Sequence, residues 1–266
     1  MTVLKRVTRR LTAVGSPGSP QPEDAVKYLA LATDYDGTIA HDGVVDDATL
    51  SALRRVRDSG RKLVLVSGRE LEDFFATFAH ADLFDRLVLE NGALLYEPAT
   101  KRVRPIAAPP PPQLVAELLK RGVPLSAGRS IIATVVPHEH TVLSAIRDLG
   151  LEWHLVFNKG SVMVLPPGVT KATGLAPALE ELGIPLDRVV GVGDAENDHA
   201  FLQLCGLSVA VANALPAVKA TADLVTAGAR GAGVIELIDR LLADDFAGVR
   251  PNPARHPPGP VATAGG

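Results

Sequence analysis

The sequence predicts an α/β protein in which a doubly wound parallel sheet carries an inserted, smaller α/β module. Short apolar runs alternate with amphipathic stretches along most of the chain, and strand followed by helix, repeated, builds a parallel sheet. Polar and acidic residues follow directly after several of these runs, where open α/β sheets bind ligands. Between residues 93 and 165 the pattern changes, which indicates the inserted module.

The first predicted strand is the apolar run from Tyr28 to Ala32, and an acidic pair follows it in Asp34-Tyr35-Asp36-Gly37-Thr38. An apolar run of this length bounded by a glycine turn is typical of a buried strand. The carboxylates of Asp34 and Asp36 are then expected at the mouth of the sheet. Asp-Gly is also a strong turn signal, so an ordinary turn is the alternative interpretation.

The next predicted helix spans residues 47 to 59, with Leu50, Leu53 and Val56 at helical spacing and Gly60 as its stop. The strand over residues 62 to 66 then leads into Ser67-Gly68-Arg69. A hydroxyl, a glycine amide and a guanidinium suit a phosphate. The alternative for Ser67 is a helix cap for the segment from residue 70 to 80.

The predicted module spans residues 93 to 165 and begins with the proline-rich break at 109 to 112. A helix over 113 to 121, a strand over 131 to 136, a helix over 138 to 149 and a hairpin over 152 to 165 follow. This order predicts two αββ units that form an open-faced sheet. Such a module above the catalytic edge could exclude water and select the leaving group. The alternative is a separate domain without a catalytic role.

A second acidic cluster follows the strand Val189 to Gly193, in Asp194-Ala195-Glu196-Asn197-Asp198. Mg²⁺ prefers oxygen ligands and is usually held by one or two carboxylates plus substrate phosphate, and Asp34 with Asp194 could supply that pair. The alternative is a helix N-terminus, which acids and asparagine cap. Lys171 opens the preceding helix, where a cation opposes the helix dipole unless it faces anions.

Further strands are predicted over residues 209–211 and 224–225, and a last helix over 233–242. Residues 1–27 are basic and then linker-like, and residues 246–266 are rich in Pro, Gly and Ala. Both tails are predicted to be disordered. A transit peptide is the alternative for the first of them.

The chain has 266 residues, a formal charge of -3 and 47% hydrophobic residues, which suffices for one large core or two modest ones. The absence of a basic excess, together with 4% aromatic residues, argues against a nucleic-acid surface. No apolar run approaches the length of a membrane span. Cys205 is the only cysteine, which fits a reducing cytoplasm.

Together these motifs resemble those of the haloacid dehalogenase-like (HAD) hydrolases. The four motifs of that superfamily occur in order, as Asp34 to Thr38, Ser67, Lys171 and Gly193 to Asp198. The long interval between the second and third motifs resembles subfamily IIB, the Cof-type and phosphoglycolate phosphatase-like proteins with a C2 cap. The pair Asn91-Gly92 resembles that subfamily as well. The resemblance implies a HAD-like Rossmannoid core over residues 28–92 and 166–245 and an α/β cap over 93–165.

The resemblance also implies a Mg²⁺-dependent phosphatase acting on a small phosphomonoester, such as a sugar phosphate or a phosphoglycolate-like compound. Asp34 would attack phosphorus to form an aspartyl-phosphate, and Asp36 would act as general acid and base. Ser67, the Gly68 amide and Lys171 would stabilise the phosphoryl oxygens. The implied metal set is Asp34, the Asp36 carbonyl and Asp194, with Asp198 as ligand support or as an anchor for Lys171. The expected substrate-binding residues are Ser67, Gly68, Arg69, Asn91, Lys171 and Asn197.

The chain departs from many relatives before the third motif, where Val162 to Gly168 lacks their acidic residue and Lys-Gly pair. This departure weakens a sugar assignment. Arg129, His138 and Lys159 are expected to include the cap residues that contact a polar leaving group. The expected partner is a small phosphorylated metabolite, without nucleic acid or membrane, for a monomer or small homo-oligomer.

A phosphomutase with the same motifs and a noncatalytic phosphate-ligand sensor are the alternatives. The intact pair of Asp34 and Asp36 disfavours the sensor. A nucleotide-dependent kinase is disfavoured because no Gly-x-x-x-x-Gly-Lys-Ser/Thr loop occurs.

Overall fold

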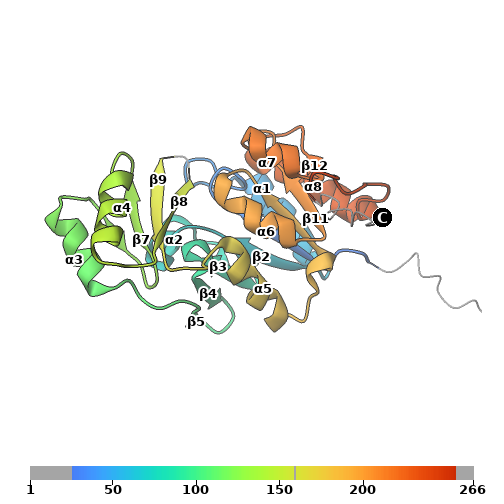
Figure 1. Cartoon of the computed structure of the whole chain (residues 1–266). Helices are drawn as coiled ribbons and strands as arrows, with labels where there is room; N and C mark the ends of the chain where they lie inside the picture. The colour runs from blue at the N-terminus through green and yellow to red at the C-terminus, as the bar shows by residue number, and fades with distance from the viewer. Residues whose placement is uncertain (1–25, 159, 256–266) are drawn as a thin grey trace, which may run out of the picture.

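The core is built on one large sheet, seen in the computed structural model, which describes residues 26–158 and 160–255 (Figure 1). The sheet has eight strands in the order β12-β11-β10-β1-β2-β3-β4-β5, and those from β12 to β3 pair in parallel. The predicted doubly wound parallel sheet is thereby confirmed. Its strands are β1 (Ala30–Asp34), β2 (Lys62–Val66), β3 (Arg86–Leu89), β4 (Leu94–Glu97), β5 (Arg102–Pro105), β10 (Val189–Gly193), β11 (Leu207–Ala210) and β12 (Leu224–Val225).

Strand β1 lies at the centre, between β10 and β2, and every one of its residues is buried. Strands that are covered on both faces read as continuous apolar runs, which is why the runs of β1, β2 and β10 are visible in the sequence. The register pairs Thr33 with Val192 on one side and with Leu65 on the other. The carboxyl ends of these three strands therefore meet at one edge of the sheet, where the predicted motifs lie.

Helices cover both faces of this sheet. The connections β1-α1-β2 and β10-α6-β11 move in opposite directions along it, and right-handed crossovers then place α1 and α6 on opposite faces. Helix α8 packs on α1, and α5 packs on α6 (Figure 1). The core helices are α1 (Asp47–Asp58), α2 (Leu71–Thr77), α5 (Lys171–Glu181), α6 (His199–Leu204), α7 (Pro216–Thr221) and α8 (Arg230–Asp244), with short 3-10 turns η2 (Ala81–Leu83), η3 (Glu90–Gly92), η4 (Leu186–Arg188) and η5 (Glu196–Asp198).

The cap is a second sheet of four antiparallel strands in the order β6-β7-β9-β8, with two helices. Its element order is αββ repeated twice, as the sequence predicts. The cap has its own apolar cluster, which includes Leu118, Ile132, Val142 and Val164. Its elements are α3 (Pro112–Lys120), β6 (Ser126–Ala127), β7 (Ile132–Val135), α4 (Glu139–Asp148), β8 (His154–Asn158) and β9 (Ser161–Leu165).

The predicted cap boundary at residue 93 is wrong, because β4 and β5 belong to the core sheet. They pair antiparallel beside β3, and Leu94 and Leu95 are buried in or against the core cluster. The turn η3 reverses the chain with left-handed backbone at Asn91 (φ 56°) and Gly92 (φ 102°). A Cβ at Gly92 would lie 1.9 Å from the Thr170 carbonyl oxygen, so glycine is required where this turn meets the start of α5. The separate sheet begins only after residue 105.

The predicted disordered tail from residue 246 is also wrong for its first ten residues, which the structure describes and which contact the core through Phe246, Asn252 and Arg255. Phe246 is buried against the ring of Tyr28, with the ring centroids 6.1 Å apart. The Asn252 amide donates to Asp223 Oδ1 at 2.7 Å, and the buried Arg255 pairs with Asp223. The composition of this segment predicted disorder, but Phe246 packs against Tyr28 and Arg255 forms an ion pair with Asp223, and both contacts are buried. The tails over residues 1–25 and 256–266 lie outside the described residues.

Within the part of the chain that the structure describes, no helix combines the length and the apolarity that a membrane crossing requires.

Candidate active site

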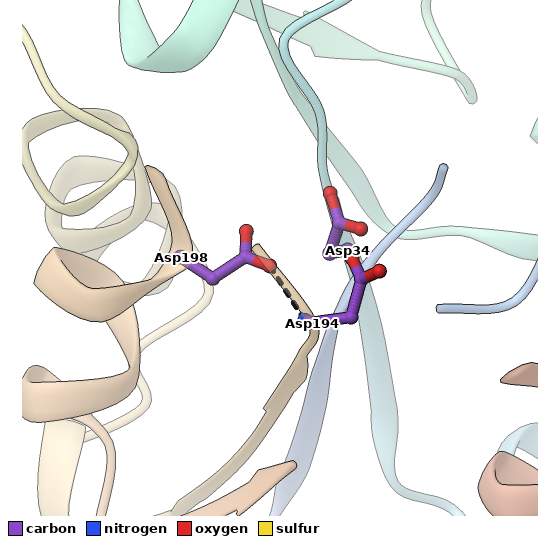
Figure 2. Close-up of side chains that lie close together, drawn as sticks. All are labelled: Asp34, Asp194 and Asp198. Carbon is purple, nitrogen blue, oxygen red and sulfur yellow. Dashed lines mark hydrogen bonds between the residues drawn. The ribbon is translucent and has the colours of Figure 1, made fainter. Parts of the chain in front are cut away.

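Three buried carboxylates meet at the carboxyl edge of the core sheet (Figure 2). Asp34 ends β1, Asp194 follows β10, and Asp198 ends η5. One carboxylate oxygen of each residue lies within 4.8 Å of one oxygen of each of the others. Because like charges repel strongly in a buried site, this arrangement requires cations. The sequence placed all three residues at this edge, and the structure brings them together.

Lys171, the first residue of α5, supplies one positive charge to this cluster. Its Nζ donates to Asp34 Oδ1 at 2.6 Å and to Asp198 Oδ1 at 2.5 Å, and its side chain is fully buried. Burial by itself would lower the pKa of Lys171, but the carboxylates of Asp198 and Asp34 outweigh it and raise that pKa. Lys171 is therefore charged. The Thr170 hydroxyl accepts from the Thr173 amide, which fixes the start of α5 and with it the lysine.

Asp198 is held by three donor atoms of the site. Its Oδ1 accepts from Lys171, and its Oδ2 accepts from the backbone amides of Asp194 at 2.7 Å and of Ala195 at 2.9 Å. Both oxygens are thus engaged by the protein. In this arrangement Asp198 anchors Lys171, which is one of the two roles that the sequence left open for it.

Asp34 and Asp194 hold the oxygens best placed for a metal ion. Burial, followed by the charge of Asp198, raises the pKa of Asp34 to about 8. Oxygen atoms from three buried carboxylates, all within 4.8 Å of one another, are the ligand type that a hard divalent cation prefers. The donor set therefore fits Mg²⁺. The carboxylate of Asp36 lies outside this three-acid cluster, so its expected part in the metal site is the backbone carbonyl alone.

Asn213 orients this side of the site, and the sequence analysis missed it. Its Nδ2 donates to the Gly37 carbonyl at 2.8 Å and lies 3.3 Å from Asp194 Oδ2, while its Oδ1 accepts from the Arg230 amide at 2.7 Å. Its position in the sequence, shortly after a predicted strand, is the signal that could have identified Asn213 as a site residue. Asn213 follows β11, so it lies beyond the carboxyl end of another parallel strand of the same sheet.

Asp36, the expected general acid and base, is clamped by Arg69. The guanidinium donates through Nε to Oδ2 at 2.7 Å and through NH2 to Oδ1 at 2.8 Å, a fork that fixes the carboxylate plane. Arg69 also pairs with Asp73 and contacts the ring face of Tyr35. Hydrogen bonding to Asp36 is the largest cause that raises the pKa of Arg69. The structure thus pairs Arg69, which was expected to bind substrate, with Asp36.

Ser67 and Gly68 lie directly beyond β2 and beneath the cap. The Ser67 hydroxyl oxygen accepts from the Arg69 amide at 3.2 Å, and its own proton has no acceptor among the described residues. A Cβ at Gly68 would lie 2.9 Å from Met163 Sδ of the cap. Glycine therefore lets the backbone approach the cap closely here, and its amide remains accessible to a phosphate.

Asn91 and Asn197 lie together at the back of the site. The Asn197 Nδ2 donates to Asn91 Oδ1 at 3.0 Å, and both side chains are buried. Asn197 Oδ1 is buried without a partner among the described residues. The sequence expected both to bind substrate, and the structure places them side by side with one acceptor still to be satisfied.

A cleft of about 690 Å³ separates the core from the open face of the cap sheet. Arg129 pairs its guanidinium with Glu72, and neither Arg129 nor His138 is among the described residues that line the cleft. Lys159, the third expected cap contact, lies outside the described residues. The core contributes Asp36, Gly37, Ala40, His41, Asp42, Gly68, Arg69, Glu70, Asp73 and Arg230, and the cap contributes Ser126, Ala133, Val135, Asn158, Gly160, Ser161 and Met163.

Acidic side chains of the core hold the cap over this cleft. The buried Glu90 accepts from the backbone amides of Arg129 at 2.9 Å and Ser130 at 2.7 Å, and Glu70 accepts from the Ser126 hydroxyl at 2.7 Å. Desolvation is the largest cause that raises the pKa of Glu90. This contact could not be predicted, because nothing in the sequence pairs residue 90 with residues 129 and 130.

Comparison with known proteins gives the chain a family. The sequence model of a family described as haloacid dehalogenase-like hydrolase matches residues 31–122 and 152–238. A phosphoglycolate phosphatase of Methanothermobacter thermautotrophicus is 31% identical over 223 residues, which cover 80% of this chain and 98% of the relative. Phosphoglycolate phosphatase 2 of Saccharolobus solfataricus is 29% identical over 236 residues, covering 82% of this chain and 94% of the relative.

Solved structures share the fold. A haloacid dehalogenase-like hydrolase from Bacteroides thetaiotaomicron superposes with a TM-score of 0.69 at 22% identity, covering 81% of this chain and all of that one (100%). A HAD subclass IIB sugar phosphatase superposes with a TM-score of 0.66 at 21% identity, covering 80% of this chain and 98% of that one. Core and cap together thus occur in known proteins.

Proposed function

The chain belongs to the haloacid dehalogenase-like hydrolases, with the fold of subfamily IIB, and is a phosphatase; we propose that it hydrolyses a small phosphomonoester with Mg²⁺ through an aspartyl-phosphate on Asp34. One observation carries the proposal. Among the described residues, three buried carboxylates and one buried lysine meet at the sheet edge beside the cleft, where Lys171 and two backbone amides engage both oxygens of Asp198. Only one oxygen of Asp34 accepts a hydrogen bond from the described residues, so its other oxygen is available for chemistry.

Asp34 is the nucleophile in this proposal. One of its oxygens accepts from Lys171, which holds the carboxylate in place, while the other is left to attack phosphorus. The bond from phosphorus to the alcohol oxygen breaks as the bond to Asp34 forms, and water then hydrolyses the aspartyl-phosphate. Two displacements thus replace one difficult step. Bound Mg²⁺, held by Asp34, Asp194 and the Asp36 carbonyl, would neutralise charge on the phosphoryl oxygens.

Asp36 transfers the protons. As an acid it protonates the leaving alcohol, and as a base it then takes a proton from the attacking water. The Arg69 fork holds its carboxylate in one orientation at the cleft. Lys171, the Ser67 hydroxyl and the Gly68 amide supply positive charge and donors for the phosphoryl oxygens, which is the main source of rate in phosphoryl transfer. The cap excludes water during this sequence.

A phosphate-release screen tests the proposal. We expect Mg²⁺-dependent turnover within a panel of phosphoglycolate, sugar phosphates, nucleotides and cofactor phosphates. A chelator should abolish turnover, Mg²⁺ should restore it, and Ca²⁺ should inhibit it because the larger ion accepts more oxygens and looser geometry at the nucleophile. Full activity in excess chelator would refute the metal assignment. Phosphoryl transfer to a second hydroxyl in the presence of a bisphosphate activator would identify a mutase, and binding without turnover a sensor.

Metal binding has a readout that does not need turnover. Mg²⁺ that binds only the folded protein should raise the unfolding midpoint of the parent in a concentration-dependent way. Asp194→Asn should reduce this shift strongly, because the amide lacks the charge that the cation requires. Asp239→Asn is the matched control, since Asp239 lies on the exposed face of α8, where it pairs with Arg55. Equal shifts in all three proteins would show that the ion binds elsewhere.

A further inference from the structure

The basic side chains that line the cleft differ in whether an acidic side chain pairs with them. Arg69 is committed to Asp36 and Asp73. His41 lies 3.5 Å from Asp42 on the exposed rim. Arg230 lines the same cleft, and its guanidinium has no acidic partner, hydrogen-bond acceptor or aromatic partner among the described residues.

The acids of the cleft do not neutralise Arg230 either. Asp36 and Asp73 pair with Arg69, Glu70 accepts from Ser126, and Asp42 pairs with His41. Residue 230 also opens α8, where a cation opposes the helix dipole. An unpaired guanidinium at this place has an unfavourable electrostatic environment, which an anion in the cleft would correct.

The backbone of Arg230 is tied to the catalytic edge. Its amide donates to Asn213 Oδ1 at 2.7 Å, and the same asparagine donates to the Gly37 carbonyl and lies against Asp194. Arg230 adopts a left-handed conformation with φ of 50°, which glycine adopts more readily. It is the one charged residue in Gly228-Ala229-Arg230-Gly231-Ala232-Gly233, so a long side chain stands where the local backbone favours a small one.

We propose that Arg230 binds an anionic group on the leaving alcohol, and that this residue makes the enzyme prefer phosphate esters of acidic alcohols over esters of neutral ones. The inference rests on the proposed function and names its substrate class. A planar guanidinium binds a carboxylate or a phosphate through two parallel hydrogen bonds, so both anions satisfy the same chemistry. The substrate is then either a phosphorylated hydroxy acid or a bisphosphate.

Matched esters test this preference. 2-Phosphoglycolate carries a carboxylate on its leaving alcohol, ethylene glycol bisphosphate carries a second phosphate there, and 2-hydroxyethyl phosphate carries no charge there. A fourth substrate, p-nitrophenyl phosphate, measures the chemical step without a contact to Arg230. Arg230→Gly removes the guanidinium and suits the left-handed backbone, so it is expected to fold. Arg230→Lys keeps the charge but loses the fork. Arg54→Ala is the control, an exposed arginine on α1 away from the cleft.

Arg230→Gly should lower kcat/KM for the preferred anionic ester by about 10- to 100-fold, the scale of losing a charge-assisted hydrogen bond. The neutral ester and the aryl phosphate should lose much less, Arg230→Lys should fall between, and Arg54→Ala should match the parent. The anionic ester for which kcat/KM falls further identifies the anion that Arg230 binds as a carboxylate or a phosphate.

Equal losses on anionic and neutral esters, or no loss on either, would overturn the role of Arg230 while leaving phosphatase activity in place. A parent that hydrolyses none of the four esters with Mg²⁺ but does hydrolyse another member of the wider panel would overturn the inference about Arg230 alone. A parent that hydrolyses no ester of either set would contradict the proposed function, and the inference about Arg230 would fall with it.

Discussion

The core side and the cap side of the cleft differ in the charge of the side chains that line them. The core wall contains charged side chains, such as Arg69 paired with Asp36, and the buried ion pairs of Lys171 with Asp34 and Asp198 lie in the core beside the cleft. The cap wall contributes small or uncharged side chains of its sheet, namely Ser126, Ala133, Val135, Asn158, Gly160, Ser161 and Met163. The comparison teaches that chemistry is fixed in the core, whereas the described cap residues supply shape and exclude water. Selection by charge then falls to the core as well, at Arg230.

The largest effect is expected at the nucleophile. Asp34→Asn should lower turnover by roughly four orders of magnitude or more, the scale of removing a catalytic nucleophile. The amide is nearly isosteric, so circular dichroism should match the parent. Phosphate release within about tenfold of the parent would place the nucleophile elsewhere and would remove the distinction between a chemical core wall and a passive cap wall.

Lys171 should have the next largest effect, and on stability as well as on rate. Lys171→Met leaves Asp34 and Asp198 buried without their shared cation, which we expect to lower the free energy of unfolding by about 3 to 5 kcal/mol. Turnover should fall by about 10²- to 10³-fold, as for loss of one donor to a developing oxyanion. Denaturant unfolding and phosphate release measure the two. Lys120→Met, on the exposed side of α3, is the control and should change neither.

A smaller effect is expected where the two walls join. Glu90→Gln replaces one acceptor of the Arg129 and Ser130 amides by a donor, so the free energy of unfolding should fall by about 1 to 3 kcal/mol. KM should rise more than kcat falls, because the cap is held less firmly over the cleft. Glu152→Gln, on the exposed cap surface, is the matched control.

The same variant has a pH signature. The folded-state pKa of Glu90 is raised above its ordinary value of 4.5, mainly by desolvation, with Glu70 and Glu72 adding to the rise. The contribution of a group with a raised pKa is fully present below that ordinary value and is lost as pH rises through the folded-state pKa. The stability difference between parent and Glu90→Gln should therefore shrink as pH rises from 4.5. Parallel stability curves would show that Glu90 does not titrate with folding.

Sequence patterns predicted the catalytic edge better than any other part of the molecule. Asp34 ends a strand that is buried on both faces, and Ser67 and Asp194 follow directly after two more. Such strands are visible as apolar runs. Asn213 obeys the same rule beyond β11, but it carries no charge and stands outside the acidic motifs, so it was missed. The pairing of Arg69 with Asp36 could not be predicted, since it depends on side-chain geometry across two different loops.

The cap and the C-terminal segment were less predictable for two reasons. The residues of β4 and β5 were assigned to the cap because the chain reverses at Asn91 and Gly92, directly after β3. The pattern of apolar residues beyond this reversal does not show which of the two sheets the next strands join. Residues 246–255 have the composition of a disordered tail, yet Phe246 and Arg255 are both buried against the core. Both outcomes depend on tertiary contacts rather than on local pattern.

Detection of a phosphorylated Asp34 tests the central claim most directly. Asp36→Asn should be mixed with p-nitrophenyl phosphate and Mg²⁺ and quenched in acid. The leaving nitrophenolate needs no proton from Asp36, whereas hydrolysis of the aspartyl-phosphate still needs a base, so the phosphorylated enzyme should accumulate. We expect the peptide that contains Asp34 to carry the mass of one added phosphoryl group, and Asp34→Asn to carry none. Release of nitrophenolate with no phosphoryl group on Asp34, or with the group on another residue, would contradict the account.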